Sequence, residues 1–459
     1  MFRRTPHDRQ IIGLAIPALG ALAAEPLYIL ADTAVVGHLG TPQLAGLALA
    51  SQVLLILVSI FIFLAYGTTA TVGRLLGAGR EREAAHQAVQ SLWLALIVGV
   101  VLSTATLIAA DPLLRLLGGR GEVLDAASTY LRVSAFGLPA LLISLAGVGY
   151  LRGQQDTLRP LYVSLATAAG NLILELILIY GFDQGIGASA LSTVVMQWLG
   201  AVAYLLWIGA GVRRYHVGLV PRGAAIGSLA VSGFHLLIRT TSLRASFVVA
   251  VAVAARIGDD DLAAHQIAFE IWSLLALSLD AIAIAGQAIV ANLLGAGDGD
   301  GARAAGRRMI EIGVLTGCAA ALLVVVSQPW LPGVFSPDPA VVSLAAFLFW
   351  WLAIMQPVNG LVFTLDGLLI GAGDLRYLAV AMAGASAVFV PLALGVAVAD
   401  LGIGWLWAAL VVFMMMRVVP LTHRFRSGRW IVLGAQDAQL VLEADCGDSQ
   451  PPLELGAPD

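Results

Sequence analysis

The sequence predicts an all-α polytopic membrane protein, with twelve transmembrane helices in two parallel six-helix lobes. Three observations lead to this fold class. Hydrophobic residues make up 59% of the 459 residues and charged residues only 12%, whereas soluble proteins carry about 25% charged residues. Twelve apolar stretches of roughly membrane-spanning length follow one another, and the second half of the chain repeats the first. This composition excludes a soluble enzyme and a nucleic-acid-binding protein.

Turn residues and charged residues separate the twelve stretches. The predicted spans are 11–36, 44–73, 88–110, 125–150, 158–180 and 187–211 in the first lobe, and 226–257, 262–291, 309–328, 340–370, 376–398 and 401–418 in the second. Several exceed the roughly 20 residues that cross a bilayer, so we expect tilted or kinked helices. A cleaved signal is the alternative for the first stretch, which is too long for a signal's apolar region.

Arginine placement predicts the orientation in the membrane. The chain has 25 basic residues, all of them arginine. With the N-terminus inside, 19 arginines fall in inner loops and three in outer loops; the remaining three lie within spans, at Arg132, Arg239 and Arg244. Because basic residues concentrate on the cytoplasmic side, we expect both termini in the cytoplasm and a location in the plasma or inner membrane.

A repeat with a constant offset of 218 residues defines the two lobes. Residues 75–79 match residues 293–297, and the residues Gly149 and Asp156 match Gly367 and Asp374. Six spans per repeat place both repeats in the same orientation, so their pseudo-two-fold axis lies along the membrane normal. This is the architecture of an alternating-access transporter.

The predicted domains follow from the repeat and the charge pattern. They are an N-lobe at 1–212, a cytoplasmic inter-lobe linker at 213–225, a C-lobe at 226–420 and an acidic tail at 421–459. We expect the tail to be cytoplasmic and disordered.

Polar residues inside the spans are candidate functional residues, because they are costly in a bilayer. They are Asp32 in span 1, Asn171 and Glu175 in span 5, and Ser189 and Thr193 in span 6. The i, i+4 spacing places each pair on one helix face. At a rise of 1.5 Å per residue, Asp32, Glu175 and Thr193 all lie about 8–9 Å below the outer helix ends. We expect them to form one cluster.

Two tyrosines lie at or near the depth of this cluster in the membrane. Tyr130 lies five residues into span 4, and Tyr28 lies about one helical turn deeper than Asp32. The 218-residue offset maps Asp32, Asn171, Glu175 and Thr193 to apolar residues, which are Ala250, Phe389, Ala393 and Val411. The cluster is therefore predicted in the N-lobe alone, either as an ion-coupling site or as a hydrogen-bond network that only fixes the helices.

The expected chemistry is reversible ion binding. A carboxyl group in a low-dielectric environment binds a proton near neutral pH, because its charged form is disfavoured. Carboxylate, amide and hydroxyl oxygens also suit Na⁺, so the residues leave H⁺ and Na⁺ open; no other metal and no cofactor is predicted. Pro17 and Pro26 lie in the same span as Asp32 and permit it to bend. We hypothesise that protonation of Asp32 changes this bend.

The C-lobe has polar candidates of its own. Arg239 and Asp280 lie at matching depth, so we expect an ion pair with a structural or gating role. Asp366, near the inner end of span 10, is either functional or only an interfacial carboxylate. Further acidic candidates are Glu25 and Glu270, whereas His38 and His265 are placed in or near outer loops and are not expected to couple ions.

Four stretches resemble the multidrug and toxic compound extrusion (MATE) family. Residues 25–40 resemble its first-helix signature, and residues 264–267 and 279–287 resemble its eighth-helix region. Residues 366–374 are similar to the DinF-like branch. The resemblance implies a V of two six-helix bundles. It also implies export of organic cations and other amphipathic compounds against an inward H⁺ or Na⁺ gradient.

The resemblance also implies roles for particular residues. Asp32 matches the coupling carboxylate, and Asn171, Glu175 and Thr193 match the residues beside it. Pro17 matches the proline tied to bending, and Tyr130 matches a fourth-helix tyrosine. The family usually has aspartate where this chain has Glu175, which leaves the ion preference open.

We therefore predict an H⁺-coupled, or alternatively Na⁺-coupled, antiporter for amphipathic small molecules. Two alternatives remain: a flippase for lipid-linked precursors, which would need several cavity-facing arginines, and an exporter of organic anions, as in plant relatives of this branch. A membrane enzyme and a passive channel are disfavoured, because the spans lack a catalytic constellation and charged rings. The expected partners are the bilayer and a small molecule, with no nucleic acid, and we expect a monomer.

Overall fold

The structure, a computed structural model, describes residues 6–182 and 184–435 of the chain and is all-helical over these residues. Eleven of its helices are long and apolar enough to cross a membrane, or twelve if one bent helix pair counts as a single span. The predicted fold class is confirmed.

The N-lobe comprises the first helices of the chain. They are α1 (Pro6–Gly37), α2 (Thr41–Phe61), α3 (Phe63–Gly77), α4 (Glu81–Leu116), α5 (Gly121–Ala135), α6 (Leu138–Gly153), α7 (Leu158–Leu176), the π-helix η1 (Ile177–Gly181) and α8 (Ile186–Arg214). The C-lobe comprises α9 (Gly223–Ile257), α10 (Asp259–Gly295), α11 (Gly299–Ser327), the short α12 (Pro332–Phe335), α13 (Pro339–Gly371), α14 (Leu375–Val398) and α15 (Ile403–Ser427).

Span 4, predicted as one stretch at 125–150, is the bent pair α5 and α6, which meet at an angle of 50°. Pro139 lies in the first turn of α6, where a residue without a backbone N–H is tolerated. The bend therefore coincides with the proline that the predicted span contained. Span 1, in contrast, runs as one helix through both Pro17 and Pro26.

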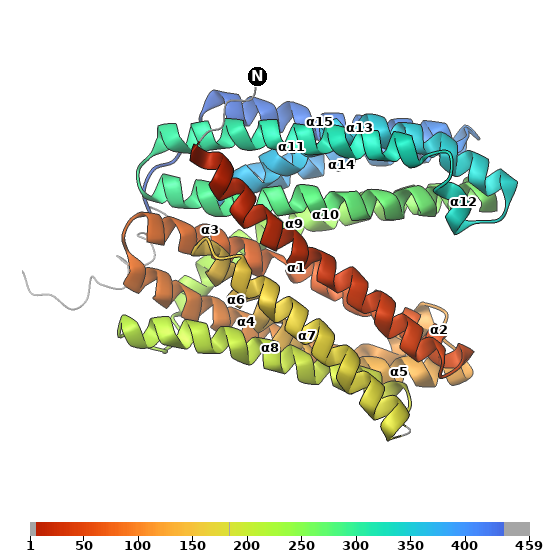
Figure 1. Ribbon diagram of the computed structural model, residues 1–459, viewed down its shortest axis with the longest axis horizontal. Helices are drawn as coiled ribbons and strands as arrows, with labels where there is room; N and C mark the ends of the chain where they lie inside the picture. The colour runs from red at the N-terminus through yellow and green to blue at the C-terminus, as the bar shows by residue number, and fades with distance from the viewer. Residues whose placement is uncertain (1–5, 183, 436–459) are drawn as a thin grey trace, which may run out of the picture.

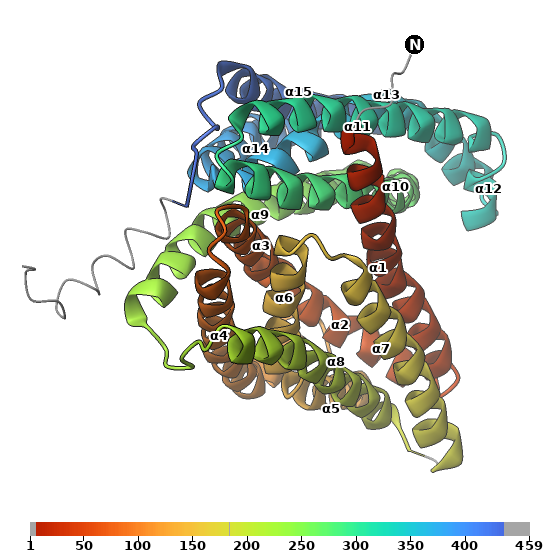
Figure 2. The ribbon, with the colours of Figure 1, turned by 60° about the vertical axis from the view of Figure 1, so that its left-hand side comes forward.

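The two lobes lie side by side with their helices roughly aligned (Figure 1). They meet at the left of that view, where α3 packs against α10, and they separate towards the right, between α2 and α5 on one side and α12 on the other (Figures 1 and 2). The helices on the left are joined by the connections that follow α3, α6, α8, α10 and α13, and arginines lie in these connections or in the helix ends beside them. We call this side the Arg-rich end.

The repeated sequence at 75–79 and 293–297 is a repeated helix end. Gly79 and Gly297 both have left-handed backbone conformations, with φ of 72° and 79°. The N–H groups of Arg80 and Asp298 then donate back to the carbonyls of Leu75 and Leu293, each at 2.9 Å. Glycine adopts this conformation without a steric penalty, so the motif ends α3 and α10 in the same way.

These two helix ends also cross each other closely. A Cβ atom on Gly77 would overlap the carbonyl oxygen of Asn292, and one on Gly295 would overlap the carbonyl oxygen of Arg74. The 218-residue offset relates Gly77 to Gly295 and Arg74 to Asn292. The contact is therefore self-complementary, as at a two-fold axis, and the pseudo-two-fold axis of the lobes passes through it.

Polar contacts reinforce the junction of the lobes at the Arg-rich end. The Arg74 guanidinium donates to the carbonyl oxygens of Ala372 at 2.5 Å and Gly434 at 3.2 Å. Asp8 of α1 accepts two hydrogen bonds from Arg308 of α11, at 2.6 and 3.0 Å. The lobes are thus joined by backbone packing, by hydrogen bonds and by an ion pair at one end.

The predicted tail boundary requires correction. We expected disorder from residue 421, but α15 continues to Ser427 and the chain stays packed to residue 435. Leu421, Phe425 and Trp430 are buried, so their apolar side chains order this segment. The rest of the predicted tail, 436–459, lies outside the described residues. In the inter-lobe linker predicted at 213–225, the helices leave only 215–222 as a connection.

Candidate functional site

The N-lobe polar residues of α1 and α8 lie together. Asp32 is only 5% exposed, and its carboxylate accepts a hydrogen bond from the Ser189 hydroxyl at 2.6 Å. One turn away on α1, the Tyr28 hydroxyl lies 2.8 Å from the Thr193 hydroxyl. These two bonds connect α1 to α8 at the level that the helix rise predicted.

Helix α7 adds an amide and a second carboxyl group. The Asn171 Nδ2 atom donates to Thr193 Oγ1 at 3.0 Å and to Ser192 Oγ at 3.4 Å. Glu175 is fully buried and interacts electrostatically with the Asp32 carboxyl group. Neither of its carboxyl oxygens has a hydrogen-bond partner within 6–182 and 184–435. Ser192, which was not among the residues predicted from the sequence, connects α8 to α7 through this bond with Asn171.

This arrangement favours the binding of a single small cation. Two adjacent buried carboxyl groups do not both ionise unless a proton or a cation lies between them. Within the described chain, no group of three or more His, Cys, Asp or Glu side chains is placed to hold a metal ion. The oxygen atoms that the cluster offers suit H⁺ or Na⁺ rather than a transition metal.

The remaining N-lobe candidates border this cluster or its helix. Tyr130 of α5 is buried, and its hydroxyl interacts with Thr193 and Tyr28. Pro17 is buried and Pro26 is exposed on α1, and they lie 15 and 6 residues before Asp32. A proline removes one backbone hydrogen bond from its helix. Helix α1 can therefore bend at two positions between Asp32 and the Arg-rich end.

The C-lobe contains no equivalent cluster among its described residues. The positions equivalent to Asp32, Asn171 and Glu175 are the buried residues Ala250, Phe389 and Ala393. Phe389 packs against Phe413, with ring centroids 5.3 Å apart. The scaffold is therefore duplicated, and the polar site is not.

His265 lies in a different place from the one expected. We placed it in or near an outer loop, but it is fully buried in α10, where its ring stacks on Phe269 and contacts Trp407 edge-on. The α10 helix begins at Asp259, so six helical residues precede this histidine.

The C-lobe arginine has a different partner from the predicted one. Arg239 of α9 donates to Asp366 of α13 at 2.7 Å, and Arg417 of α15 donates to the same carboxylate oxygen at 2.5 Å. The predicted Arg239–Asp280 ion pair is wrong, because depth along a helix does not say which face a residue occupies. Asp280 interacts with Arg239 and Arg152 over a longer range. Asp366 is buried within the protein, where it pairs with both arginines.

Three arginines that we counted as loop anchors are buried in the protein. Arg417 is 3% exposed, Arg74 is 7% exposed and Arg152 is 9% exposed. Arg417 is flanked on both sides by apolar residues, Met416 and Val418, and this pattern is the signal that would have placed it in a span.

Comparison with known proteins identifies the family. Residues 17–180 and 227–394, one segment in each lobe, match the MatE family. The chain is 32% identical over 442 residues to Protein DETOXIFICATION 44, chloroplastic, of Arabidopsis thaliana, covering 92% of this chain and 84% of that protein. It is 27% identical over 445 residues to DNA damage-inducible protein F of Escherichia coli (strain K12), covering 93% and 94%.

The fold is also that of solved family members. The crystal structure of MATE in the bent conformation superposes with a TM-score of 0.83 at 22% identity, covering 96% of this chain and 98% of that chain. Two lobes built on a repeat, a multi-pass helical membrane fold and family matches in both halves agree. The chain belongs to the MATE family of multidrug and toxic compound efflux transporters, which are transporters and not enzymes.

Proposed function

We propose that this protein is a monomeric secondary antiporter that exports amphipathic small molecules from the cell in exchange for H⁺. Its Arg-rich end and both termini face the cytoplasm, as the distribution of arginines favours. The observation that carries the proposal is the pair of buried carboxyl groups of Asp32 and Glu175, present in one lobe only.

The contacts of the cluster favour a proton over Na⁺. A proton requires only the two carboxyl groups, whereas Na⁺ also requires neighbouring oxygens as ligands. The Thr193 oxygen already takes part in hydrogen bonds with Tyr28, Asn171 and the Ser189 carbonyl, so it would have to give up a partner in order to coordinate a metal ion. Asn171 Oδ1, in contrast, has no partner among the described residues. A proton therefore makes fewer demands on these oxygens than Na⁺ does.

The lobe contacts support alternating access. The lobes are joined at the Arg-rich end and separate at the other, so this conformation corresponds to one that is closed towards the cytoplasm. Helix α1 packs against both α7 and α10, and it carries Asp32 as well as Asp8, which pairs with Arg308. A bend of α1 at Pro17 or Pro26 on protonation would therefore alter both the ion site and the junction of the lobes.

Efflux in inverted membrane vesicles tests the proposal. A fluorescent organic cation is the substrate, and a proton gradient and a sodium gradient are applied separately. We expect proton-driven transport to fall at least tenfold in Asp32→Asn and Glu175→Gln, while Glu122→Gln, an exposed carboxyl in the same lobe, transports like wild type. Unchanged proton-driven transport in Asp32→Asn would contradict the proposal. Loss of sodium-driven transport alone would instead assign the site to Na⁺.

One observation favours a second candidate, the export of organic anions. Among the described residues, three buried or half-buried arginines near the junction of the lobes interact with two carboxylates, Asp280 and Asp366. The arginines are Arg152, Arg239 and Arg417. The excess positive charge would attract an anionic substrate. The same vesicle assay with a di- or tricarboxylate as substrate decides between the two, because only an anion exporter would lose transport in Arg152→Gln.

A further inference from the structure

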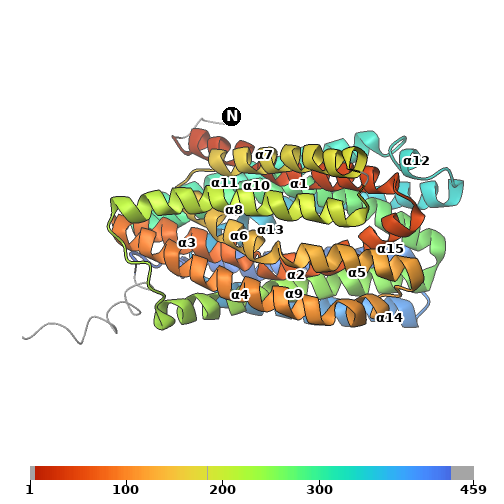
Figure 3. The same ribbon diagram turned by 90° about the horizontal axis from the view of Figure 1, so that it is seen from below.

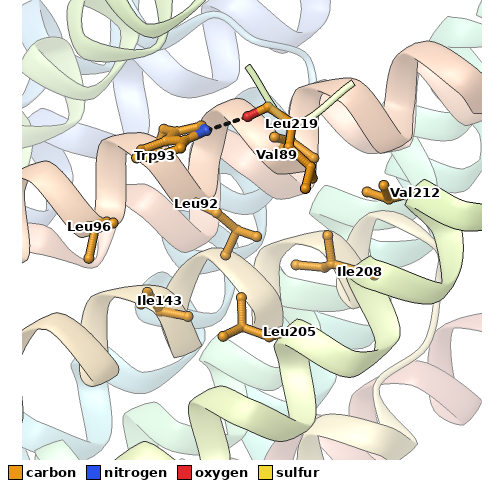
Figure 4. Close-up of a pocket in the computed structure, with 10 residues that line it drawn as sticks. Val89, Leu92, Trp93, Leu96, Ile143, Leu205, Ile208, Val212 and Leu219 are labelled. Atoms are coloured by element: carbon orange, nitrogen blue, oxygen red, sulfur yellow. Dashed lines mark hydrogen bonds between the residues drawn. The ribbon is translucent and has the colours of Figure 1, made fainter. Parts of the chain in front are cut away.

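An apolar cavity of about 300 Å³ lies in the N-lobe, apart from the polar cluster. Helices α4 and α8 form its sides, α6 forms its floor and the inter-lobe connection covers one end (Figure 4). Its lining includes Val89 and Trp93 of α4, Ile143 of α6, Ile208 and Val212 of α8, and Leu219 of the connection. A cavity of this size accommodates a ligand or part of one, and its lining selects for hydrocarbon.

Hydrogen bonds fix the connection over the cavity. The Trp93 indole N–H donates to the Leu219 carbonyl at 2.8 Å (Figure 4). The Gln90 amide donates to the Val220 carbonyl at 3.1 Å and accepts from the Arg222 N–H at 2.8 Å. The segment that links the two lobes is therefore held on α4 as the cover of this cavity.

The helices that line the cavity lie on the side of the N-lobe opposite the C-lobe. In the view from that side, α6 is visible between α8 and α4 (Figure 3). Its α8 residues lie between Leu205 and Val212, within nine residues of the helix end at Arg214. At 1.5 Å per residue it extends about 14 Å from that end, which is about half of the ~30 Å hydrocarbon core. The cavity thus spans one leaflet.

The duplicated fold does not require this cavity. By the 218-residue offset, Trp93 of α4 corresponds to Glu311 of α11 and Ile208 of α8 corresponds to Arg426 of α15. The C-lobe thus has two charged residues where the N-lobe has an apolar lining.

Basic side chains surround the covered end of the cavity. Arg213, Arg214 and Arg222 are exposed, and no ion pair links any of them to a carboxylate in the described parts of the chain. Clusters of exposed arginines beside a membrane helix attract anionic lipids of the cytoplasmic leaflet. An anionic phospholipid is complementary to this site. Its acyl chain matches the apolar cavity, and its phosphate matches the arginines at headgroup level.

We propose that this cavity binds an anionic phospholipid of the cytoplasmic leaflet. One acyl chain lies in the slot between α4 and α8, and the phosphate lies against Arg213, Arg214 and Arg222. This assignment rests on the proposed orientation and is independent of the coupling ion. A lipid held there contacts the connection between the lobes and so supports its position on α4.

Native mass spectrometry of the full-length protein in mild detergent tests the site. The protein is titrated with phosphatidylglycerol and with phosphatidylcholine of identical acyl chains. We expect at least fivefold preferential retention of one phosphatidylglycerol molecule. Gly209→Leu should abolish this retention, because a side chain at Gly209 enters open space in the cavity. The variant Arg213→Gln/Arg214→Gln/Arg222→Gln should bind both lipids equally.

Matched controls keep the result specific. Gly384→Leu adds the same side chain at an exposed C-lobe glycine with open space around it, and Arg376→Gln/Arg426→Gln/Arg429→Gln removes three exposed arginines elsewhere. Both should retain phosphatidylglycerol like wild type. If Gly209→Leu fails to fold, as judged by its thermal unfolding temperature, Ile208→Phe replaces it.

Four outcomes would overturn the proposal. The first two are equal binding of the two lipids by wild type and full retention of phosphatidylglycerol by Gly209→Leu. The third is competition by glycerol phosphate alone, which would indicate a site for free phosphate. The fourth is displacement of the lipid by the fluorescent cation, which would assign the cavity to substrate. No ion gradient is applied in these measurements, so their failure leaves the antiport proposal untouched.

Discussion

Glu175 is fully buried without a hydrogen-bond partner in the described chain, in a position where the family resemblance implies aspartate. Burying an unpaired carboxyl group is costly, so packing alone gives no reason to keep it. Its carboxyl group interacts with that of Asp32. At this scale, the cost of burial indicates function.

The Arg239–Asp366–Arg417 cluster allows a residue-scale test of stability. Asp366→Asn leaves two arginines without their shared carboxylate, and breaking a buried ion pair in this way costs about 3–5 kcal/mol. We expect this loss in the free energy of unfolding, measured by denaturant titration in mild detergent. Arg417→Met should cost less, because the Arg239–Asp366 pair remains.

An exposed ion pair serves as the control for that measurement. Asp111 and Arg132 are 3.2 Å apart with both side chains more than 40% exposed, and such pairs contribute about 0–1 kcal/mol. Asp111→Asn should therefore be nearly neutral. Equal effects of Asp366→Asn and Asp111→Asn would show that the buried cluster is not structural.

Candidate site residues could be predicted from the sequence where the free-energy cost of burying a polar side chain in a membrane span marks them. Asp32, Asn171, Glu175, Ser189 and Thr193 stand out because polar residues are rare in apolar spans, and the structure brings them together. The partner of Arg239 was not predictable, because it depends on how α9, α13 and α15 rotate and pack. No periodicity in a single helix contains that information.

At the scale of elements, the crossing of α3 and α10 depends on two glycines without side chains. Gly77 and Gly295 each lie against a backbone carbonyl of the other helix. Backbone atoms cannot move aside as a flexible side chain can, so any Cβ atom there forces the helices apart. The repeated motif therefore determines both where each helix ends and how closely the two lobes approach each other.

Gly77→Ala should weaken the junction of the lobes. Overpacking of this kind costs about 1–3 kcal/mol, and we expect a shift towards conformations with the Arg-rich ends apart. Spin labels at Arg82→Cys and Asp300→Cys, two exposed positions related by the repeat, report the distance. Gly67→Ala in the same helix meets open space and should leave the distance distribution unchanged. A distribution unaffected by Gly77→Ala would contradict the role of this contact.

At the scale of the whole molecule, the lobes are joined at one end only. Arg74, Arg308 and Asp8 make contacts between lobes, and alternating access requires all of these contacts to break in each cycle. The segment at 428–435 adds a further connection, because the Gly434 carbonyl accepts a hydrogen bond from the Arg74 guanidinium of the N-lobe at 3.2 Å. The contacts that hold the lobes together at the Arg-rich end are therefore distributed over several helices and the segment after α15.

Cross-linking across this junction should stop transport reversibly. We replace Asp8 and Arg308, which form an ion pair between α1 and α11, with cysteine, and the native Cys318 and Cys446 with serine. A short bifunctional thiol reagent should reduce efflux at least tenfold, and dithiothreitol should restore it. Each single-cysteine variant is the control. Full transport by the cross-linked protein would show that these ends do not separate during transport.

The sequence by itself determined the all-helical membrane fold, the duplication and the level of the polar cluster, because span length, repeat offset and helix rise are one-dimensional quantities. It placed the tail boundary too early, because the burial of Trp430 depends on contacts with the rest of the C-lobe. Only the tertiary structure decided which carboxylate Arg239 and Arg417 share, that Arg74 joins the lobes, and that an apolar cavity lies beneath the inter-lobe connection. Those features depend on which helix faces meet, and meeting faces are set by packing in three dimensions.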